Sequence, residues 1–125
     1  MKDYQEKFIR LALEAEALNF GDFTLKSGRK SPYFFNAAKM LNTKFLMSLS
    51  ECYTKTIEDL NVTFDSIYGP AYKGIFLASI IGSSLGRSKL DIPISFNRKE
   101  EKEHGEGGDI IGQLPSGNVL IVDDV

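Results

Sequence analysis

The sequence of 125 residues contains a single cysteine, Cys52, and no tryptophan. One cysteine excludes an internal disulfide and a cysteine-rich zinc site. Long apolar runs are also absent, because none approaches the roughly 18–20 residues that a membrane-spanning helix needs. The first seven residues are too polar to lead into the apolar stretch of a signal peptide. These absences predict a cytoplasmic protein with no membrane partner.

An excess of charge of one sign is missing as well. The sequence has 15 Lys and Arg residues and 17 Asp and Glu residues, which gives a formal net charge of −2. Non-specific binding to a nucleic-acid backbone requires a strongly positive surface, so we expect no nucleic-acid partner. Apolar residues make up 42% and charged residues 26%, which is ordinary for a globular protein. Length and composition together predict one domain over residues 1–125.

The first part of the chain predicts a helix followed by a hairpin. Apolar residues between Tyr4 and Leu18 fall on one helical stripe, and Gly21 is expected to end that helix. Residues 23–36 are typical of two short strands joined by a turn at Gly28.

The rest of the chain alternates helices and short apolar strands. A helix is expected from about Thr43 to Leu60, and Cys52 lies beside its apolar stripe as a packing residue. Val119–Val122 is apolar without alternation, as expected of a central strand in a parallel sheet. The other expected elements are the strands Ser66–Tyr68 and Ile92–Phe96, the helix Ile75–Leu85 and the short segment Asp109–Gly112. The predicted fold class is α/β, with a parallel sheet flanked by helices.

Two adjacent carboxylates, Asp123 and Asp124, follow the predicted strand Val119–Val122. Open α/β sheets bind their ligands at the carboxyl ends of the strands. Two carboxylates there can hold sugar hydroxyls or a hard cation such as Mg²⁺. Alternatively, one Asp caps the next helix and the other faces solvent. The pair alone does not decide between these two interpretations.

A charged, glycine-rich segment at residues 97–108 is a second candidate site. It holds three basic residues, four acidic residues, the only histidine (His104) and three glycines. Such a run is usually a solvated surface. It directly follows a predicted strand, however, so it emerges at the same sheet edge as the carboxylates if the strands are parallel. Its glycines also give the freedom expected of a lid that closes over a ligand.

The turn at residues 68–74 leads from a predicted strand into a predicted helix. Main-chain N–H groups at such a turn can bind an anion, and Lys73 adds positive charge. The G-x-G-x-x-G and Walker A patterns are both absent. Ordinary dinucleotide and nucleoside-triphosphate sites are therefore disfavoured.

Four segments together resemble the orotate phosphoribosyltransferase family. They are, in chain order, residues 23–34, 68–74, 96–107 and 119–125. The Val-Leu-Ile-Val-Asp-Asp-Val run is shared by many phosphoribosyltransferases. The Lys-Ser-Gly-Arg-Lys-Ser-Pro-Tyr-Phe run and the Arg-Lys-x-x-Lys-x-His-Gly loop are much more specific to the orotate family.

The resemblance implies a type I phosphoribosyltransferase fold, with an N-terminal helix and hood over about residues 1–40 and the first part of the core sheet over about residues 62–125. It implies transfer of the phosphoribosyl group from phosphoribosyl pyrophosphate to orotate in de novo pyrimidine synthesis, with Mg²⁺ as cofactor. It also implies a homodimer, in which residues 97–108 form a mobile loop that closes over the neighbouring subunit's active site.

The resemblance also implies roles for individual residues. Phe34 and Phe35 line the orotate pocket. Lys102, Asp123 and Asp124 are the implied catalytic residues, and the acidic pair addresses the ribose hydroxyls and the magnesium-bound donor. The residues implied in binding phosphoribosyl pyrophosphate are Lys26, Tyr72, Lys73, Arg98, Lys99, Lys102, His104, Asp123 and Asp124.

One departure from the family pattern concerns the end of the sequence. The family's phosphate-binding loop, rich in Thr, Gly and Ala, follows the Asp-Asp-Val motif, whereas this sequence stops at Val125. We therefore expect a domain truncated at its C-terminus, and no activity from residues 1–125 alone. The alternative to an enzyme is a non-catalytic, nucleotide-sensing regulatory relative. That function needs a basic nucleic-acid-binding face, which the net charge does not suggest.

Overall fold

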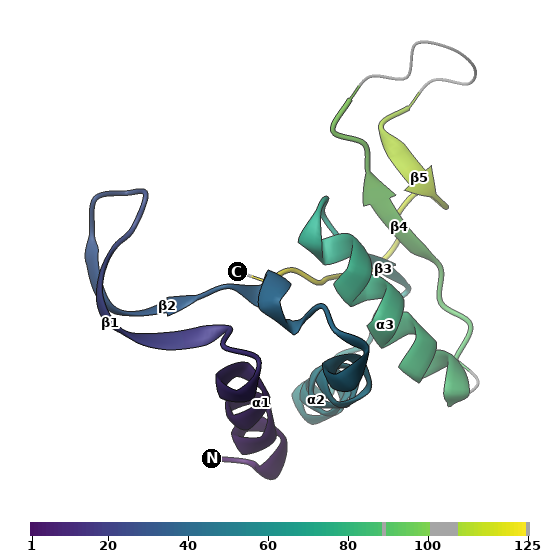
Figure 1. Cartoon of the computed structure of the whole chain (residues 1–125). Coiled ribbons are helices and arrows are strands. Elements are labelled where there is room, and N and C mark those ends of the chain that lie inside the picture. The colour runs from purple at the N-terminus through teal and green to yellow at the C-terminus, as the bar shows by residue number, and fades with distance from the viewer. Residues whose placement is uncertain (89, 101–107, 125) are drawn as a thin grey trace. The chain divides into compact units, whose positions relative to one another are not determined.

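The computed structural model of the protein describes residues 1–88, 90–100 and 108–124. They form two compact units, Met1–Lys55 and Thr56–Val125. The first unit contains, in chain order, helix α1 (Asp3–Glu14), strands β1 (Leu18–Thr24) and β2 (Lys30–Phe35), the 3-10 helix η1 (Ala37–Met40) and most of helix α2 (Thr43–Leu60) (Figure 1). No helix within the described residues is long and apolar enough to cross a membrane.

Helix α1 ends before Leu18, the end predicted from its apolar stripe. Glu16 has a left-handed φ of 56°. The N–H of Ala17 then donates a hydrogen bond to the carbonyl of Ala12 at 2.8 Å, which is the bond that closes a helix in a Schellman motif. The expected stop at Gly21 is wrong, because this glycine lies within β1. Glu16 thus adopts the left-handed conformation that is expected of a glycine at a helix end.

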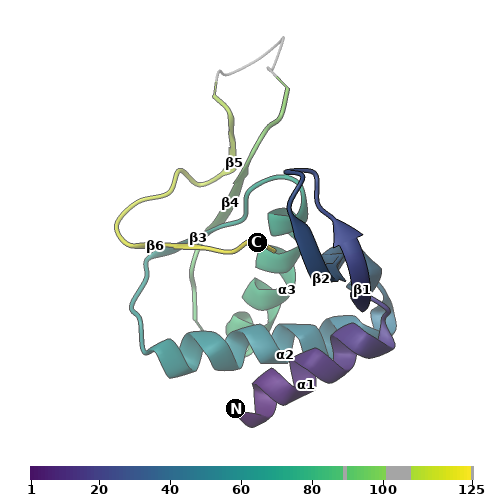
Figure 2. The same ribbon diagram turned by 90° about the vertical axis from the view of Figure 1, so that its left-hand side faces the viewer.

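Strands β1 and β2 form the predicted hairpin and lie side by side (Figure 2). They pair antiparallel, with Leu18 opposite Phe35 and Thr24 opposite Lys30. In the turn between them Gly28 has a φ of 82°, a conformation that favours glycine because it has no Cβ. The hairpin and its turn residue are confirmed, but β1 begins at Leu18, well before the predicted start at Phe23.

Helix α2 spans the predicted residues Thr43–Leu60. Asn42 precedes it, and its Oδ1 accepts a hydrogen bond from the N–H of Lys44 at 3.0 Å, as an N-cap side chain does. Cys52 is 3% exposed. Burial raises the pKa of its thiol, which disfavours the reactive thiolate. The prediction that Cys52 is a packing residue is confirmed.

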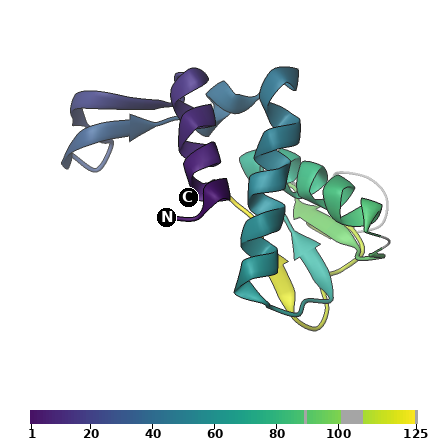
Figure 3. The same cartoon turned by 90° about the horizontal axis from the view of Figure 1, so that it is seen from below.

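The second unit contains β3 (Ser66–Tyr68), α3 (Lys73–Arg87), β4 (Ile94–Asn97), β5 (Ile110–Gly112) and β6 (Val119–Ile121). The strands form one sheet in the order β5-β4-β3-β6. Strand β3 pairs in parallel with both β4 and β6, whereas β5 pairs antiparallel with β4. Helix α3 packs on β3 and β4 (Figure 3). The α/β fold class is confirmed.

The core of this unit lies between α3 and the sheet. Ile67 on β3 and Leu77 and Ile81 on α3 are at most 2% exposed. The helix approaches the sheet closely at Gly82, where an added Cβ would clash with Cδ1 of Ile94 on β4. Because that atom is the far end of a flexible side chain, a rotamer change of Ile94 could relieve the clash, so this contact does not by itself require a glycine.

Strand β6 has the predicted direction but not the predicted position. It runs parallel to β3, with Val119 opposite Ser66 and Ile121 opposite Tyr68. Its continuous apolar run predicts a central strand, yet in the described part of the chain β6 is at the edge of the sheet. Val119 is 37% exposed and Ile121 65%. The strand's composition is that of a buried strand, whereas its side chains here are largely accessible.

Candidate active site

The carboxyl ends of β3, β4 and β6 lie at the same end of the sheet, because the three strands are parallel. The turn at residues 69–72 follows β3, the segment at residues 97–108 begins at the end of β4, and the acidic pair follows β6. The three segments singled out from the sequence thus start from one end of one sheet, where open α/β sheets bind ligands.

Lys73 and Asp124 form an ion pair at this end of the sheet. The Nζ atom of Lys73, the first residue of α3, donates a hydrogen bond to Oδ2 of Asp124 at 2.8 Å. The Lys73 side chain is 45% exposed, and that of Asp124 is 13% exposed. The pair joins the turn after β3 to the chain after β6, and it leaves the lysine partly accessible to solvent.

The neighbours of Asp124 favour its ionised form. Burial by itself raises the pKa of Asp124, but the hydrogen bond and the positive charge of Lys73 outweigh burial and lower the pKa below its ordinary value. A side-chain hydrogen bond with Asp123 also lowers the pKa of Asp124. In addition, Oδ1 of Asp123 accepts a hydrogen bond from the main-chain N–H of Asp124 at 2.9 Å. Asp123 itself is exposed. One carboxylate of the pair therefore faces solvent, and the other faces Lys73.

The start of segment 97–108 contacts the turn after β3. Oδ1 of Asn97 accepts a hydrogen bond from the N–H of Ala71 at 2.7 Å. The Nζ atom of Lys99 lies 5.9 Å from the centroid of the Tyr72 ring, within the range of a cation–π interaction. Sequence reasoning identified Lys99 and Tyr72 but missed Asn97. A polar residue that ends a strand beside an anion-binding turn is the signal that could have found it.

The two described ends of segment 97–108 lie next to each other. Asn97 is opposite Ile110 in the β4–β5 pairing, and the N–H of Arg98 donates a hydrogen bond to the carbonyl of Asp109 at 2.6 Å. Arg98 and Lys99 are exposed. The candidate residues Lys102 and His104 lie outside the described residues.

Two glycines allow the turn after β3 to pack closely against its neighbours. A Cβ at Gly74 would lie 2.7 Å from Cδ of Pro70 and 2.8 Å from the carbonyl oxygen of Val122. A Cβ at Gly69 would clash with the carbonyl group of Gly74. Because backbone atoms cannot move aside without shifting the chain, both positions require glycine. Sequence reasoning gave neither residue a packing role.

The remaining three candidate residues lie on the hairpin of the first unit. Lys26 is exposed, in the turn between β1 and β2. Phe34 and Phe35 are successive residues of β2 and so point to opposite faces of the hairpin. The Phe34 ring lies 5.8 Å from that of Phe23, and the Phe35 ring lies 6.2 Å from that of Phe8 on α1. Phe34 is 43% exposed, so its ring stays accessible to a ligand.

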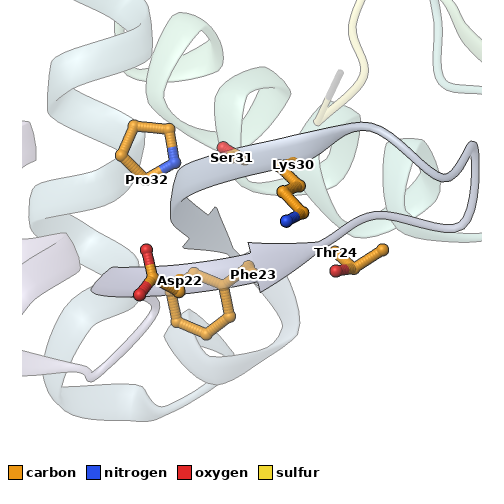
Figure 4. A pocket seen from close by; sticks show the side chains of 6 residues that line it. All are labelled: Asp22, Phe23, Thr24, Lys30, Ser31 and Pro32. Atoms are coloured by element: carbon orange, nitrogen blue, oxygen red, sulfur yellow. The ribbon is translucent and has the colours of Figure 1, made fainter.

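The hairpin also carries a pocket of about 460 Å³. Its lining residues are Asp22, Phe23, Thr24, Lys30, Ser31 and Pro32 (Figure 4). Phe23 connects the pocket to Phe34 through their ring contact. None of the candidate residues from the sequence lines the pocket itself.

Within the described ranges, no three His, Cys, Asp or Glu side chains gather into a metal site. Asp123 and Asp124 supply carboxylate oxygens, the ligand type that Mg²⁺ prefers. Asp124 is engaged by Lys73. The arrangement therefore fits a cation that is held mainly by another ligand, with Asp123 as the accessible protein carboxylate.

Comparison with known proteins finds close relatives along the whole chain. The chain is 52% identical over 126 residues to the orotate phosphoribosyltransferase of Stenotrophomonas maltophilia (strain K279a), a match that covers 100% of this chain and 58% of that protein. It is 47% identical over 125 residues to the orotate phosphoribosyltransferase of Chromobacterium violaceum, again over 100% of this chain and 58% of that protein. No protein-family model matches the chain.

A solved structure agrees with the sequence matches. The crystal structure of orotate phosphoribosyltransferase from Francisella tularensis matches with a TM-score of 0.79 and 42% sequence identity, over 94% of this chain and 56% of that chain. The resemblance to orotate phosphoribosyltransferases is confirmed. The α/β arrangement expected of a type I phosphoribosyltransferase is confirmed with it. The chain spans 58% of the length of these curated orotate phosphoribosyltransferases.

Proposed function

We propose that the protein containing this chain transfers the phosphoribosyl group from phosphoribosyl pyrophosphate to orotate, giving orotidine 5′-monophosphate and pyrophosphate in de novo pyrimidine synthesis. The observation that carries the proposal is the meeting of Lys73 and Asp124 at the carboxyl end of the sheet. It sets a cation suited to an anionic leaving group beside a carboxylate suited to ribose. Relatives that are 52% and 47% identical are orotate phosphoribosyltransferases, which favours the enzyme over the regulatory alternative.

The reaction needs positive charge at the leaving group. Breaking the bond between ribose and pyrophosphate leaves strong negative charge on pyrophosphate, and cations already in place stabilise that charge. Lys73, Arg98 and Lys99 are exposed cations at this end of the sheet. The full set that we assign to the donor's pyrophosphate is Tyr72, Lys73, Arg98, Lys99, Lys102 and His104, of which Lys102 is the proposed catalytic residue.

Positive charge develops on the ribose as the same bond breaks. The carboxylates of Asp123 and Asp124 suit both this charge and the ribose hydroxyls, and the reaction requires no covalent nucleophile. Mg²⁺ is the proposed cofactor and, when bound, neutralises charge on the pyrophosphate oxygens. Asp123 is the exposed carboxylate of the pair, so we assign to it any direct contact of the protein with the cation.

The orotate side of the site is assigned to the hairpin. Phe34 is the proposed orotate residue because its ring is accessible, whereas Phe35 points to the opposite face of the hairpin and contacts Phe8. Lys26 reaches the donor from the hood. Because a cation-like sugar is readily hydrolysed, water must be kept out during transfer. We assign that task to the loop at residues 97–108, closing over the neighbouring subunit's site in a cytoplasmic homodimer.

The test of this function is base selectivity in the full-length protein. A site built to pair the orotate carboxylate leaves its donors unsatisfied when uracil binds, because uracil lacks that group. We expect turnover of orotate with phosphoribosyl pyrophosphate and Mg²⁺, and little turnover of uracil. Comparable rates with uracil or with a purine base would refute the orotate assignment.

A second test concerns residues 1–125 expressed alone. We propose that they do not transfer phosphoribosyl groups by themselves. The donor's phosphates need backbone N–H groups of a loop leading into a helix, and the resemblance assigns that loop to a segment outside these residues. Orotate consumption by residues 1–125 at the rate of the full-length protein would show that the described segments supply the phosphate site.

A further inference from the structure

The hydrogen bond between Asn97 and Ala71 lies where the pairing of two strands would otherwise continue. Along β3, the N–H of Ile67 donates to the carbonyl of Pro93 at 2.9 Å, and the N–H of Gly69 donates to the carbonyl of Ser95 at 3.0 Å. Each step moves two residues along both strands, as in any parallel ladder.

The next step of this ladder would join the N–H of residue 71 to the main-chain carbonyl of residue 97. Instead, the side-chain Oδ1 of Asn97 accepts the N–H of Ala71 at 2.7 Å. The side chain thus replaces the main-chain carbonyl at the point where the chain leaves β3 for the turn. Pro70, which lies between Gly69 and Ala71, has no main-chain N–H. Ala71 is half-buried, and a buried N–H without a partner is costly.

The bond has consequences for two candidate site residues. Tyr72 and Lys73 follow Ala71 directly, and α3 starts at Lys73. Fixing the N–H of Ala71 fixes the entry into the helix and therefore the point from which Lys73 reaches Asp124. Asn97 also starts the segment that carries Arg98 and Lys99, so one side chain connects the turn with the base of the loop.

We infer that Asn97 is a positioning residue, whose side-chain carbonyl holds Ala71 and thereby places Lys73 for the pyrophosphate of the donor. The inference rests on the proposed function for the identity of that ligand. The hydrogen bond itself and the binding of pyrophosphate can be tested without any turnover.

The experiment compares three variants of the full-length protein. Asn97→Ala removes the acceptor, and Asn97→Asp keeps an oxygen acceptor of the same size. Gln113→Ala removes the same kind of amide from an exposed position after β5 and serves as the matched control. The measurements are hydrogen exchange at the Ala71 amide, binding of pyrophosphate in the presence of Mg²⁺ by calorimetry, and the KM values for donor and orotate.

In Asn97→Ala we expect exchange at Ala71 to rise about tenfold and pyrophosphate affinity to fall about tenfold, the size of one lost hydrogen bond. The donor KM should rise with the loss of affinity while the orotate KM stays unchanged, a split that a general loss of structure would not give. Asn97→Asp should keep Ala71 protected. Because its added charge repels pyrophosphate, that variant is judged on exchange alone. Gln113→Ala should match the parent protein in every measurement.

Parental exchange at Ala71 together with parental pyrophosphate affinity in Asn97→Ala would overturn the inference. So would an equal rise in both KM values. If Asn97→Ala does not fold, Asn97→Asp decides, because loss of protection at Ala71 in that variant contradicts the role of the acceptor. If the parent protein does not turn over orotate, the proposed function fails, while exchange and pyrophosphate binding still test Asn97.

Discussion

Lys73 and Asp124 are 51 residues apart in the sequence, yet the Nζ of one lies 2.8 Å from the Oδ2 of the other. The contact exists because β6 pairs in parallel with β3, so that the residues following the two strands meet at the same end of the sheet. The lysine offsets the cost of partly burying the carboxylate and lowers the pKa of Asp124. The first prediction concerns this pKa.

Replacing Lys73 with glutamine should raise the pKa of Asp124. The substitution removes the positive charge and weakens the hydrogen bond, while the burial that raises the pKa remains. The measurement is a carboxyl-carbon NMR titration of Asp124 in the full-length protein. Arg87→Gln removes a cation from the other end of α3 and should leave the titration unchanged. An unchanged Asp124 pKa in Lys73→Gln would contradict the described contact.

The same ion pair predicts how stability depends on pH. The pKa of Asp124 is lower in the folded protein than in an unfolded chain, where an Asp titrates at about 4. The stabilising contribution is therefore fully present above that value, and it is lost as the pH falls through the lower folded pKa. Asp124→Asn should reduce the acid sensitivity of the unfolding midpoint at low pH. Equal acid dependence in parent and variant would exclude a contribution from the pair.

Lys73 should also contribute to binding of the donor. A hydrogen bond to a charged group contributes about 1.5–3 kcal/mol, so Lys73→Gln should raise the donor KM by about tenfold or more and change the orotate KM little. Steady-state kinetics with each substrate varied in turn measures both values. The Arg87→Gln control should keep both KM values. Equal effects on the two substrates would point to a general disturbance of the fold.

Lys102 provides a prediction that comes from the sequence and the family resemblance alone. If its ammonium stabilises charge mainly in the transition state, Lys102→Ala should lower turnover by about 10²-fold or more, while binding of the donor changes less. Lys102→Arg keeps the charge and should retain more of the turnover.

Limited proteolysis after residues of the 97–108 loop should slow when donor and Mg²⁺ are present. Parental turnover in the alanine variant would return this segment to the role of a solvated surface.

Much of the fold could be predicted from the sequence because the decisive signals are local. The apolar stripe of α2 and the turn glycine Gly28 both led to the observed elements. The end of α1 could not be predicted in the same way, because Glu16 adopts a left-handed conformation that its side chain does not favour. The position of β6 depends on which strands pair with it, and the apolar composition of a strand does not determine its pairing partners.

The same distinction between local signals and long-range contacts applies to the candidate site. The turn with Lys73 and the acidic pair could be identified from residue type and from their place after predicted strands. Asn97 carried a usable signal in its place at the end of a predicted strand, but its partner Ala71 could not be predicted, because that hydrogen bond depends on the β3–β4 register. The different surroundings of Phe34 and Phe35 were within reach of sequence reasoning, since strand alternation alone sends successive side chains to opposite faces.

The last prediction concerns the close packing that the two halves of the site require. Gly74→Ala would place a methyl group 2.8 Å from the carbonyl oxygen of Val122 and 2.7 Å from Cδ of Pro70. Either α3 or the chain after β6 must then shift. Overpacking of this kind lowers stability by about 1–3 kcal/mol.

Gly86→Ala is the matched control, since it adds the same methyl group to the same helix with nothing within 4 Å. Alanine is the better helix former, so this variant should gain up to about 0.5–1 kcal/mol. Urea unfolding of the full-length protein measures both values. Because any shift at Gly74 also moves Lys73 relative to Asp124, Gly74→Ala should raise the Asp124 pKa in the carboxyl titration, whereas Gly86→Ala should not. A Gly74→Ala protein as stable as its parent, with an unchanged Asp124 titration, would show that the turn does not need this close approach.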